Sequence, residues 1–171
     1  PKTRISLLAD VALLKLEHAE AHIALRAGRK PENEDYVVQP YCQLRFGLFA
    51  HKSYVERHGT PGGLDDIAHH DFVGNPRKRS SAPFEAWLAE HVPPERIVFQ
   101  TADALVLEQA IKDGLGLGFL PITQPEGRAD HVQIGPSLDA WTVHVWLVTH
   151  VDLQRTEKVQ AMLSCLKALE F

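Results

Sequence analysis

The spacing of hydrophobic and polar residues changes along the chain, and these changes predict a succession of short strands and helices. Alternating or continuous apolar runs are typical of strands, and apolar residues recurring every three to four positions are typical of helices. The expected strands are Ile5–Leu8, His22–Arg26, Tyr36–Ala50 (two strands or one long bent strand), Phe72–Gly74, Ile97–Gln100, Leu117–Leu120 and Trp141–Thr149. The expected helices are 13–20, 52–57, 64–68, 84–91, a helix that follows Gln100 and ends at Asp113, and 154–171.

The most distinct local unit is the strand Ile97–Gln100, its following helix and the strand Leu117–Leu120. This order predicts a right-handed parallel β-α-β crossover, with Thr101 or Asp103 capping the helix. The strand Trp141–Thr149 is apolar on both faces, which predicts an interior position in a sheet. Alternating strands and helices of this kind indicate an α/β fold with a mostly parallel sheet.

Two connecting stretches are more informative than the rest. The segment Asn75–Pro83 is rich in Pro, Arg, Lys and Ser, which predicts an exposed loop, and an amphipathic helix with Phe84, Trp87, Leu88 and His91 on one face follows it. The glycines of Gly114–Gly118 lie between a helix and a strand, the reverse of the order in a dinucleotide-binding loop. We therefore expect them to end the helix and start the strand, and we expect no nucleotide or other cofactor.

Composition narrows the class of protein. The 171 residues include 18 Lys+Arg against 22 Asp+Glu, a formal charge of -4, so the chain lacks the dense basic face that nucleic-acid binding needs. The sequence shows no signal peptide and no apolar run of the roughly 18 residues that span a bilayer. It starts without Met, as a piece of a longer protein would. Cys42 and Cys165 are expected to be free thiols in a reducing cytosol, although one long-range disulfide stays open, and Cys165 is expected to be buried.

Candidate chemistry concentrates where strands end. In open α/β sheets, ligands bind beyond the carboxyl ends of strands, and the junction at Thr101 combines such an end with a helix N-terminus. Backbone N–H groups and the Thr101 hydroxyl would favour an anionic group there, unless Thr101 only caps the helix. His18 and His22 have the i, i+4 spacing that could bind zinc on a helix, but His22 begins an expected strand, and the adjacent His69 and His70 point apart with no third ligand, so we expect no metal site. Ser80, Ser81 and Ser164 lack the context of a nucleophile, so we expect no catalytic residues.

Five segments together resemble the effector-binding domain of LysR-type transcriptional regulators. The run 21–28 resembles the family's A-D-V-A-I-R-x-G, 51–61 resembles S-P-x-Y-L-x-x-H-G-x-P, and 64–72 resembles D-L-x-x-H-x-C/F. The run 110–121 resembles A-x-x-G-x-G-I-x-x-L-P, and 148–150 also fits. Each motif is weak alone, but they occur in order and at the right spacing over nearly the whole chain.

The resemblance implies two Rossmann-like lobes of the type 2 periplasmic-binding-protein fold, joined by two crossing strands with a ligand cleft between them. Lobe I would comprise 1–45 and 125–171, and lobe II would comprise 46–124. Arg26 would pair an anionic ligand or form a surface salt bridge. By position, the effector-binding residues would be Arg26, Ala27, Asn75, Thr101, Ala102, Leu120 and Pro121.

The sequence departs from the family pattern in several places. The winged helix-turn-helix, the linker helix, and the first strand and helix of the sensing domain are absent, and His22 replaces the usual aspartate. The first helix would contribute to dimerisation, so lobe I would be incomplete. The resemblance implies the regulatory part of a cytoplasmic transcription factor that senses a small, anionic metabolite. It would contact DNA only through its missing N-terminal domain, and the full-length protein would be a dimer or tetramer.

Three alternatives stay open at the level of sequence. A periplasmic-type solute-binding protein shares the two-lobed plan, and the upstream gene sequence would distinguish it. A small α/β enzyme would turn over a substrate and lose that activity when one polar residue is mutated. A domain that serves only for assembly would have a cleft filled by apolar side chains.

Overall fold

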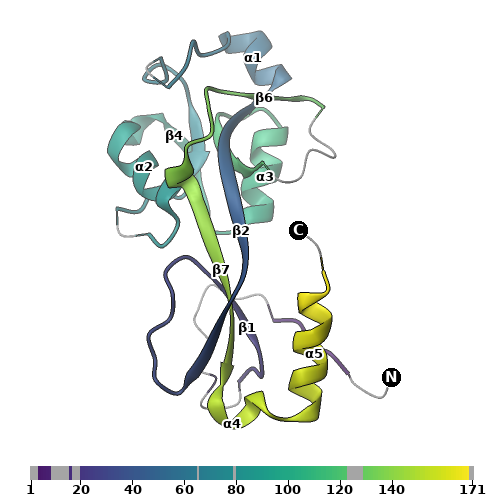
Figure 1. The fold of residues 1–171 in the computed structure, drawn as a ribbon. Coiled ribbons are helices and arrows are strands. Elements are labelled where there is room, and N and C mark those ends of the chain that lie inside the picture. The colour runs from purple at the N-terminus through teal and green to yellow at the C-terminus, as the bar shows by residue number, and fades with distance from the viewer. Residues whose placement is uncertain are drawn as a thin grey trace. The chain divides into compact units, whose positions relative to one another are not determined.

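The computed structural model describes residues 4–8, 16, 20–64, 66–78, 80–122 and 129–169 (Figure 1). The chain divides into two compact units, unit 1 (1–43 and 144–171) and unit 2 (44–143). The strands are β1 (Ala24–Ala27), β2 (Tyr36–His51), β3 (Phe72–Gly74), β4 (Ile97–Gln100), β5 (Gly118–Pro121), β6 (His131–Gln133) and β7 (Thr142–His150). The helices are α1 (Lys52–His58), α2 (Pro83–His91), α3 (Ala104–Lys112), α4 (Val151–Gln154) and α5 (Glu157–Lys167), with short 3-10 turns η2 (Pro94–Arg96) and η3 (Asp139–Trp141).

One sheet has the strand order β1-β7-β2-β5, and β6 also pairs with β2. The β1–β7, β2–β5 and β2–β6 ladders are antiparallel, with Ala24 opposite Val148 and Phe46 opposite Pro121. The expected mostly parallel sheet is therefore wrong for these ladders. Tyr36–His51 forms a single long strand, which decides between the two alternatives left open by the sequence. The interior position expected for β7 is confirmed.

In unit 1, helix α5 covers one face of the strands (Figure 1). Leu147 of β7 packs against Val159 and Leu163 of α5, and all three side chains are buried. The Tyr41 hydroxyl of β2 donates a hydrogen bond to the Leu166 carbonyl oxygen at 3.1 Å. The apolar stripe of the last helix thus finds its partner on the sheet, as its periodicity predicts.

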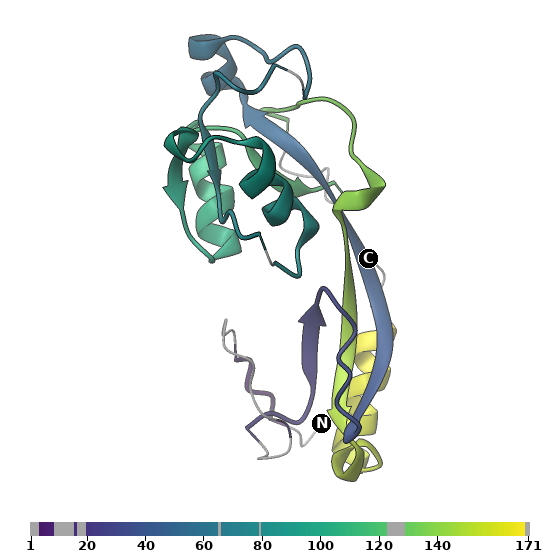
Figure 2. The same ribbon diagram turned by 90° about the vertical axis from the view of Figure 1, so that its left-hand side faces the viewer.

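In unit 2, β3 and β4 form a parallel pair, and α2 and α3 lie close to it (Figure 2). Trp141 is buried at the centre of the hydrophobic core, where its ring lies 4.7 Å from that of Phe119 and 5.5 Å from that of Trp87. Both contacts have the edge-to-face geometry that aromatic quadrupoles favour.

The predicted parallel β-α-β crossover is confirmed in its elements and in its direction, with β3 lying between β4 and the start of β5. Strand β5 pairs antiparallel with β2, and only Leu117, just before β5, bridges in parallel to Phe72 of β3. Gly116 permits this close passage, because a Cβ there would lie 2.6 Å from the Asp71 carbonyl oxygen. The chain therefore touches β3 and then continues along β2.

Two further expectations are wrong, and a third lies mostly outside the described residues. The described residues of Ile5–Leu8 form no strand, and Ile5, Leu7 and Leu8 are exposed. Residues 64 and 66–68 form turns and bends, not a helix. Most of the helix expected at 13–20 lies outside the described residues, as does His18.

Cys165 is exposed, not buried, and both cysteines are free. It follows Leu163 of the buried stripe by two positions, which is about 200° around the helix and places it on the opposite side. The sequence also predicts that Gly59 ends the helix 52–57 in the left-handed conformation. Gly59 does end α1 with a positive φ of 80°, but its ψ of 166° lies outside the left-handed helical region.

Candidate functional site

The carboxyl ends of β3 and β4 meet at one edge of unit 2. The two strands are parallel, with Gly74 opposite Gln100, so the next residues, Asn75 and Thr101, follow at the same edge. Both are half-buried, and Ala102 beside them is exposed. The structure thus brings together three of the seven predicted effector-binding residues at the kind of strand end where ligands bind in α/β proteins.

Thr101 and Asp103 cap helix α3 in series. The backbone N–H of Asp103 donates to Thr101 Oγ1 at 3.1 Å. The Asp103 carboxylate then accepts from the backbone N–H groups of Leu105 at 2.9 Å and Val106 at 3.2 Å. Two first-turn donors, which could bind an anion, therefore already have an anionic partner within the chain. Within the described part of the chain, the Thr101 hydroxyl proton and the N–H of Ala104 have no hydrogen-bond acceptor, so they could serve a ligand.

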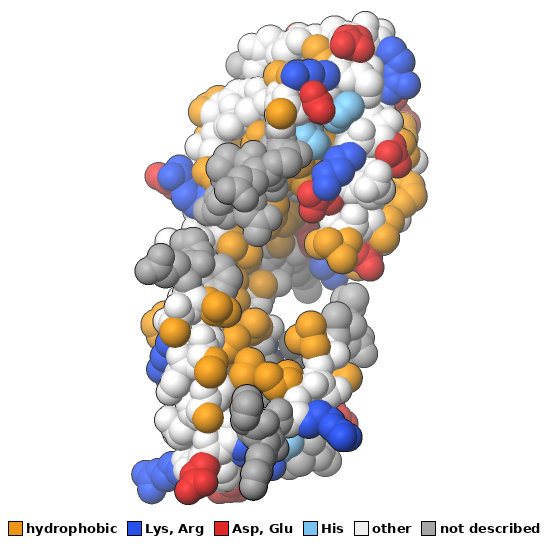
Figure 3. Space-filling model, turned by 90° about the vertical axis from the view of Figure 1, so that its right-hand side faces the viewer, with side chains coloured by type: hydrophobic (Ala, Val, Ile, Leu, Met, Phe, Trp, Pro, Cys, Tyr) orange, Lys and Arg blue, Asp and Glu red, His pale blue; other side chains and the backbone are white. Residues whose placement is uncertain are grey.

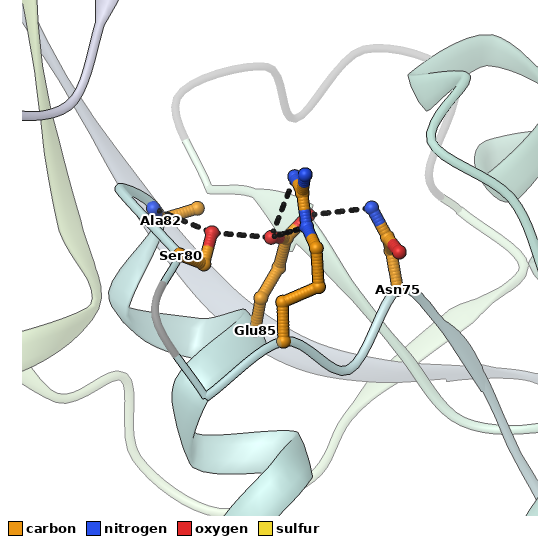
Figure 4. Close-up of polar contacts among 5 residues, drawn as sticks. Asn75, Ser80, Ala82 and Glu85 are labelled. Carbon is orange, nitrogen blue, oxygen red and sulfur yellow. Dashed lines mark hydrogen bonds and ion pairs between the residues drawn. The ribbon is translucent and has the colours of Figure 1, made fainter.

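Asn75 belongs to a polar network centred on Glu85, the third residue of α2 (Figure 4). The Asn75 amide nitrogen donates to Glu85 Oε1 at 3.3 Å, and the Arg77 guanidinium donates to Oε2 from Nε at 3.1 Å. The Ser80 hydroxyl also donates to Oε2, and Ser80 Oγ accepts from the N–H of Ala82 at 3.0 Å. The Glu85 side chain is only 12% exposed, so this carboxylate is removed from water and fully supplied with donors.

One expectation for this region is confirmed in part and another is wrong. Arg77, Lys78 and Ser81 of the expected loop Asn75–Pro83 are exposed, but the half-buried Asn75 and Ser80, together with Arg77, donate hydrogen bonds to Glu85. In the following helix, His91 was expected on the apolar face, but it is exposed and stacks on Trp87 with ring centres 4.7 Å apart. The sequence signal that was missed is Glu85, an acidic residue in the first turn of α2 that follows a segment containing Arg77 and Ser80.

A small hollow of about 20 Å³ lies beside Asn75 and Glu85. Its volume is close to what one water molecule occupies. Apart from Asn75 and Glu85, its lining is apolar or backbone, formed by Val73, Gly74, Phe84, Leu88, Leu107, Ile111 and Phe119.

Leu120 and Pro121, also predicted as effector-binding, lie on β5. The Leu120 side chain is 3% exposed and packs in a hydrophobic cluster with Val73 and Ile111, so it supports β3 and α3 from inside. Pro121 is half-buried and pairs with Phe46.

Arg26 and Ala27, the remaining predicted residues, end β1 in unit 1. The Arg26 guanidinium carbon lies 4.9 Å from the centre of the Tyr36 ring, a cation–π geometry, and Ala27 is exposed. Gly28 follows with a φ of 103°, and the Trp146 indole N–H donates to its carbonyl oxygen at 2.9 Å. The end of β1 is therefore fixed by β7.

Unit 1 also contains a hollow of about 160 Å³ that the sequence did not indicate, lined by residues 40–43 of β2 and 144–146 of β7. Cys42 lies in this lining, and partial burial raises the pKa of its thiol. Among the described residues, no group of three or more His, Cys, Asp or Glu side chains has the arrangement of a metal site. None of the described helices has both the length and the hydrophobicity needed to cross a bilayer.

The structural class and the family follow from comparison with known proteins. The chain superimposes on the regulatory domain of CrgA, a LysR-type transcriptional regulator from Neisseria meningitidis, with a TM-score of 0.78 and 21% identity over 96% of this chain and 82% of that one. Full-length AphB, a virulence activator from Vibrio cholerae, gives a TM-score of 0.68 and 17% identity over 94% of this chain and 56% of that one. The AphB regulatory domain of Vibrio vulnificus gives a TM-score of 0.67 and 18% identity over 96% of this chain and 82% of that one. No curated protein matched the sequence.

The fold is thus that of a two-lobed α/β sensing domain of the periplasmic-binding-protein type 2 class, as the resemblance implied. The sequence model described as the LysR substrate binding domain matches residues 1–170. The chain belongs to this family, and it is an effector-binding regulatory domain of a LysR-type transcriptional regulator. The family is one of transcription regulators and not of enzymes.

Proposed function

We propose that this domain senses a small anionic metabolite and that the seven residues predicted from the sequence include its contacts. The observation that carries the proposal is the alignment of Asn75 and Thr101 at one strand-end edge of unit 2. Arg26 is the only cation among the seven, so the anionic group is assigned to its guanidinium, whose planar donors suit a carboxylate. The Thr101 hydroxyl proton serves a second acceptor on the ligand.

The alternatives are weighed by the same observations. The family match favours a regulator over a stand-alone solute-binding protein. The polar groups at the strand-end edge of unit 2 argue against an enzyme. The Glu85 carboxylate is hydrogen-bonded to the Asn75 amide and the Ser80 hydroxyl, and the Asp103 carboxylate is hydrogen-bonded to the backbone of α3. Half-buried polar residues at that edge also favour ligand sensing over a purely assembling role. We therefore propose that the domain performs no catalysis.

The test is a thermal-shift screen of metabolites on the purified chain. A ligand present at 100 times its dissociation constant stabilises the folded state by about 2.7 kcal/mol, which raises the melting temperature. Arg26→Gln should abolish most of the shift given by an anionic hit, whereas Arg29→Gln, an exposed neighbour after the same strand, should leave it intact. Thr101→Val should reduce the shift, with the exposed Thr60→Val as its control. Unchanged shifts in both Arg26→Gln and Thr101→Val would contradict the site.

We further propose that the complete regulator acts in the cytoplasm and contacts DNA through an N-terminal domain outside this chain. A ligand changes such a regulator only if it binds one arrangement of the domain better than another. The arrangement of the two proposed lobes would change when the ligand binds. Lobe I comprises 1–45 and 125–171, and lobe II comprises 46–124. Promoter occupancy of the full-length protein, measured with and without the hit from the screen, tests this step.

Self-association of the full-length protein is part of the same proposal. Hydrophobic side chains lie exposed among charged ones on the face of unit 2 seen in Figure 3. On β4 and α3, the exposed apolar residues are Val98, Leu105 and Val106, with Leu105 77% exposed. Leu105→Glu should weaken the oligomer in sedimentation experiments on the full-length regulator, whereas Gln109→Glu, an exposed position on the same helix, should not.

A further inference from the structure

Arg77 is a cation of unit 2 that the sequence did not single out, and it lies next to Asn75 at the strand-end edge. The Asn75 amide nitrogen donates to Glu85 Oε1 at 3.3 Å, and Nη2 of Arg77 donates to the same oxygen at 3.4 Å. Two donors that share one acceptor atom lie close together. The edge proposed to contact the effector therefore also carries a guanidinium group.

Glu85 binds one side of the planar Arg77 guanidinium and leaves another side open. Nε donates to Glu85 Oε2 at 3.1 Å and Nη2 donates to Oε1, a two-point contact. A guanidinium has five N–H donors, and this contact uses one on Nε and one on Nη2. Among the described residues, the N–H groups of Nη1 and the second one of Nη2 have no acceptor. This end-on donor pair of Nη1 and Nη2 matches the two oxygens of a carboxylate.

The end-on donor pair is held in place and is accessible to water. The Arg77 backbone N–H donates to the Glu85 carbonyl oxygen at 3.3 Å, so both the main chain and the side chain of Arg77 are bonded to Glu85. The Arg77 side chain is 54% exposed, whereas that of Glu85 is only 12% exposed. An arginine that is already oriented loses little side-chain freedom when an anion binds to it.

The carboxylates of the protein leave room for a second anion at Arg77. An anion on the end-on donor pair would contact Arg77 directly and lie farther from Glu85, so the attraction would exceed the repulsion. The Asp103 carboxylate at the same edge is offset by the N–H groups of the α3 N-terminus, to which it is bonded. Lys78, the residue after Arg77, is exposed and adds a positive charge to this segment.

We infer that Arg77 is an anion-binding residue of this domain: its end-on donor pair and the second amide N–H of Asn75, which Glu85 does not use, form a subsite for a carboxylate group of the effector. The inference rests on the proposed function where it takes this edge as part of the effector site. The subsite lies wholly within unit 2, so it does not depend on the position of Arg26 in unit 1.

Acetate and acetamide are the probes, because they have nearly the same size and differ in charge. Each is titrated into the isotope-labelled chain at an ionic strength held constant with sodium chloride, and NMR follows the Arg77 Nε–H and the Asn75 side-chain amide. We expect acetate to shift both signals at about tenfold lower concentration than acetamide, because charge-assisted hydrogen bonds are about twice as strong as neutral ones.

Arg45 is a matched control within unit 2. Its side chain is 51% exposed and is also paired with a carboxylate, that of Asp139, at 3.4 Å. Asp139 is 99% exposed, so no buried group orients this guanidinium as Glu85 orients that of Arg77. The Arg45 Nε–H should therefore stay unshifted at the acetate concentrations that shift the Arg77 Nε–H.

Two substitutions of Arg77 separate its charge from its geometry. Arg77→Gln removes both and should abolish the acetate response of the Asn75 amide, whereas Arg45→Gln should keep it. Arg77→Lys keeps the charge but replaces the end-on donor pair by a compact ammonium group, so acetate should bind severalfold more weakly. If Arg77→Gln fails to fold, Asn75→Ala serves instead. It leaves the bonds between Arg77 and Glu85 and should weaken acetate binding at the Arg77 Nε–H.

The outcomes distinguish this inference from the proposed function. Equal responses to acetate and acetamide, an acetate response that survives in Arg77→Gln, or an equal response at Arg45 overturns the inference. If the metabolite screen then still yields an anionic ligand whose stabilising effect needs Arg26, the proposed function stands without the subsite. Acetate binding at Arg77 with no stabilising metabolite in the screen overturns the proposed function, and the anion subsite itself stands.

Discussion

The Tyr54 hydroxyl lies 3.2 Å from Nδ1 of His70, and both residues are almost completely buried. The same hydroxyl accepts a hydrogen bond from the backbone N–H of Asp71 at 2.9 Å, so its own proton is directed at His70. Nδ1 of His70 is therefore an acceptor, which requires a neutral imidazole with its proton on Nε2. Burial lowers the pKa of His70 from 6.5, opposed by Asp66 and Asp71 and reinforced by His58 and His69.

Acid should destabilise the fold through His70. The unfolded chain binds a proton at the ordinary pKa, near 6.5, whereas the folded chain binds it only at lower pH, so the unfolded state holds more protons in that interval. The stability contributed by neutral His70 is complete above about pH 6.5 and is lost as the pH falls toward the lowered pKa. Melting temperatures measured across this range should fall in acid, less so for His70→Gln. His69→Gln, at an exposed neighbour, should follow the wild type, and an identical acid response in all three would contradict the assignment.

Removing the Asp103 carboxylate should loosen the start of α3. Asp103→Ala leaves the N–H groups of Leu105 and Val106 without their intramolecular acceptor, and the loss of such a cap costs about 1 kcal/mol. Urea unfolding of the purified chain measures this cost. As control, Asp130→Ala removes an exposed pair with Lys52 at 3.3 Å, which is worth roughly 0–1 kcal/mol. If Asp103→Ala lowers the free energy of unfolding by less than Asp130→Ala does, water replaces the carboxylate as the cap of α3.

The sequence predicted the order of most elements, because local patterning decides them. The amphipathic stripe of α5, the glycine after α1 and the apolar strand β7 are each readable from a few neighbouring residues. Thr101 was predicted from the strand-to-helix junction and Asn75 from its position in the family resemblance, and both stay predictions as effector-binding residues.

Pairing and polar contacts were harder to predict because they join distant residues. The position of β3 between β4 and the start of β5, and the pairing of β5 with β2, join distant residues, which no local pattern records. Similarly, the Glu85 network depends on the fold of the segment before α2, which its polar composition made look exposed. At α3, the sequence offered Thr101 or Asp103 as the cap, and the structure uses both in series.

Gly116 should tolerate no side chain. A Cβ at this position would lie 2.6 Å from the Asp71 carbonyl oxygen and 2.9 Å from its carbonyl carbon, and backbone atoms cannot rotate away as a side chain can. Gly116→Ala should therefore separate the chain before β5 from β3, at a cost of about 1–3 kcal/mol or more. Gly62→Ala is the matched control, because its nearest atom would be a side-chain oxygen of Asp66 at 3.6 Å. Chemical denaturation of both variants makes the comparison, and equal stabilities would contradict the close passage.

The two free thiols should differ in reactivity. Cys165 is exposed on α5, whereas Cys42 is half-buried beside Tyr41 and burial raises its pKa. The thiolate is the reactive species, so at neutral pH Cys42 is both less accessible and less ionised. A chromogenic disulfide reagent should label Cys165 in a fast phase and Cys42 in a slow one, with Cys165→Ser removing the fast phase and Cys42→Ser the slow one. Denaturant should merge the two rates, because unfolding exposes both thiols. A fast phase that persists in Cys165→Ser would mean that the strand carrying Cys42 opens readily.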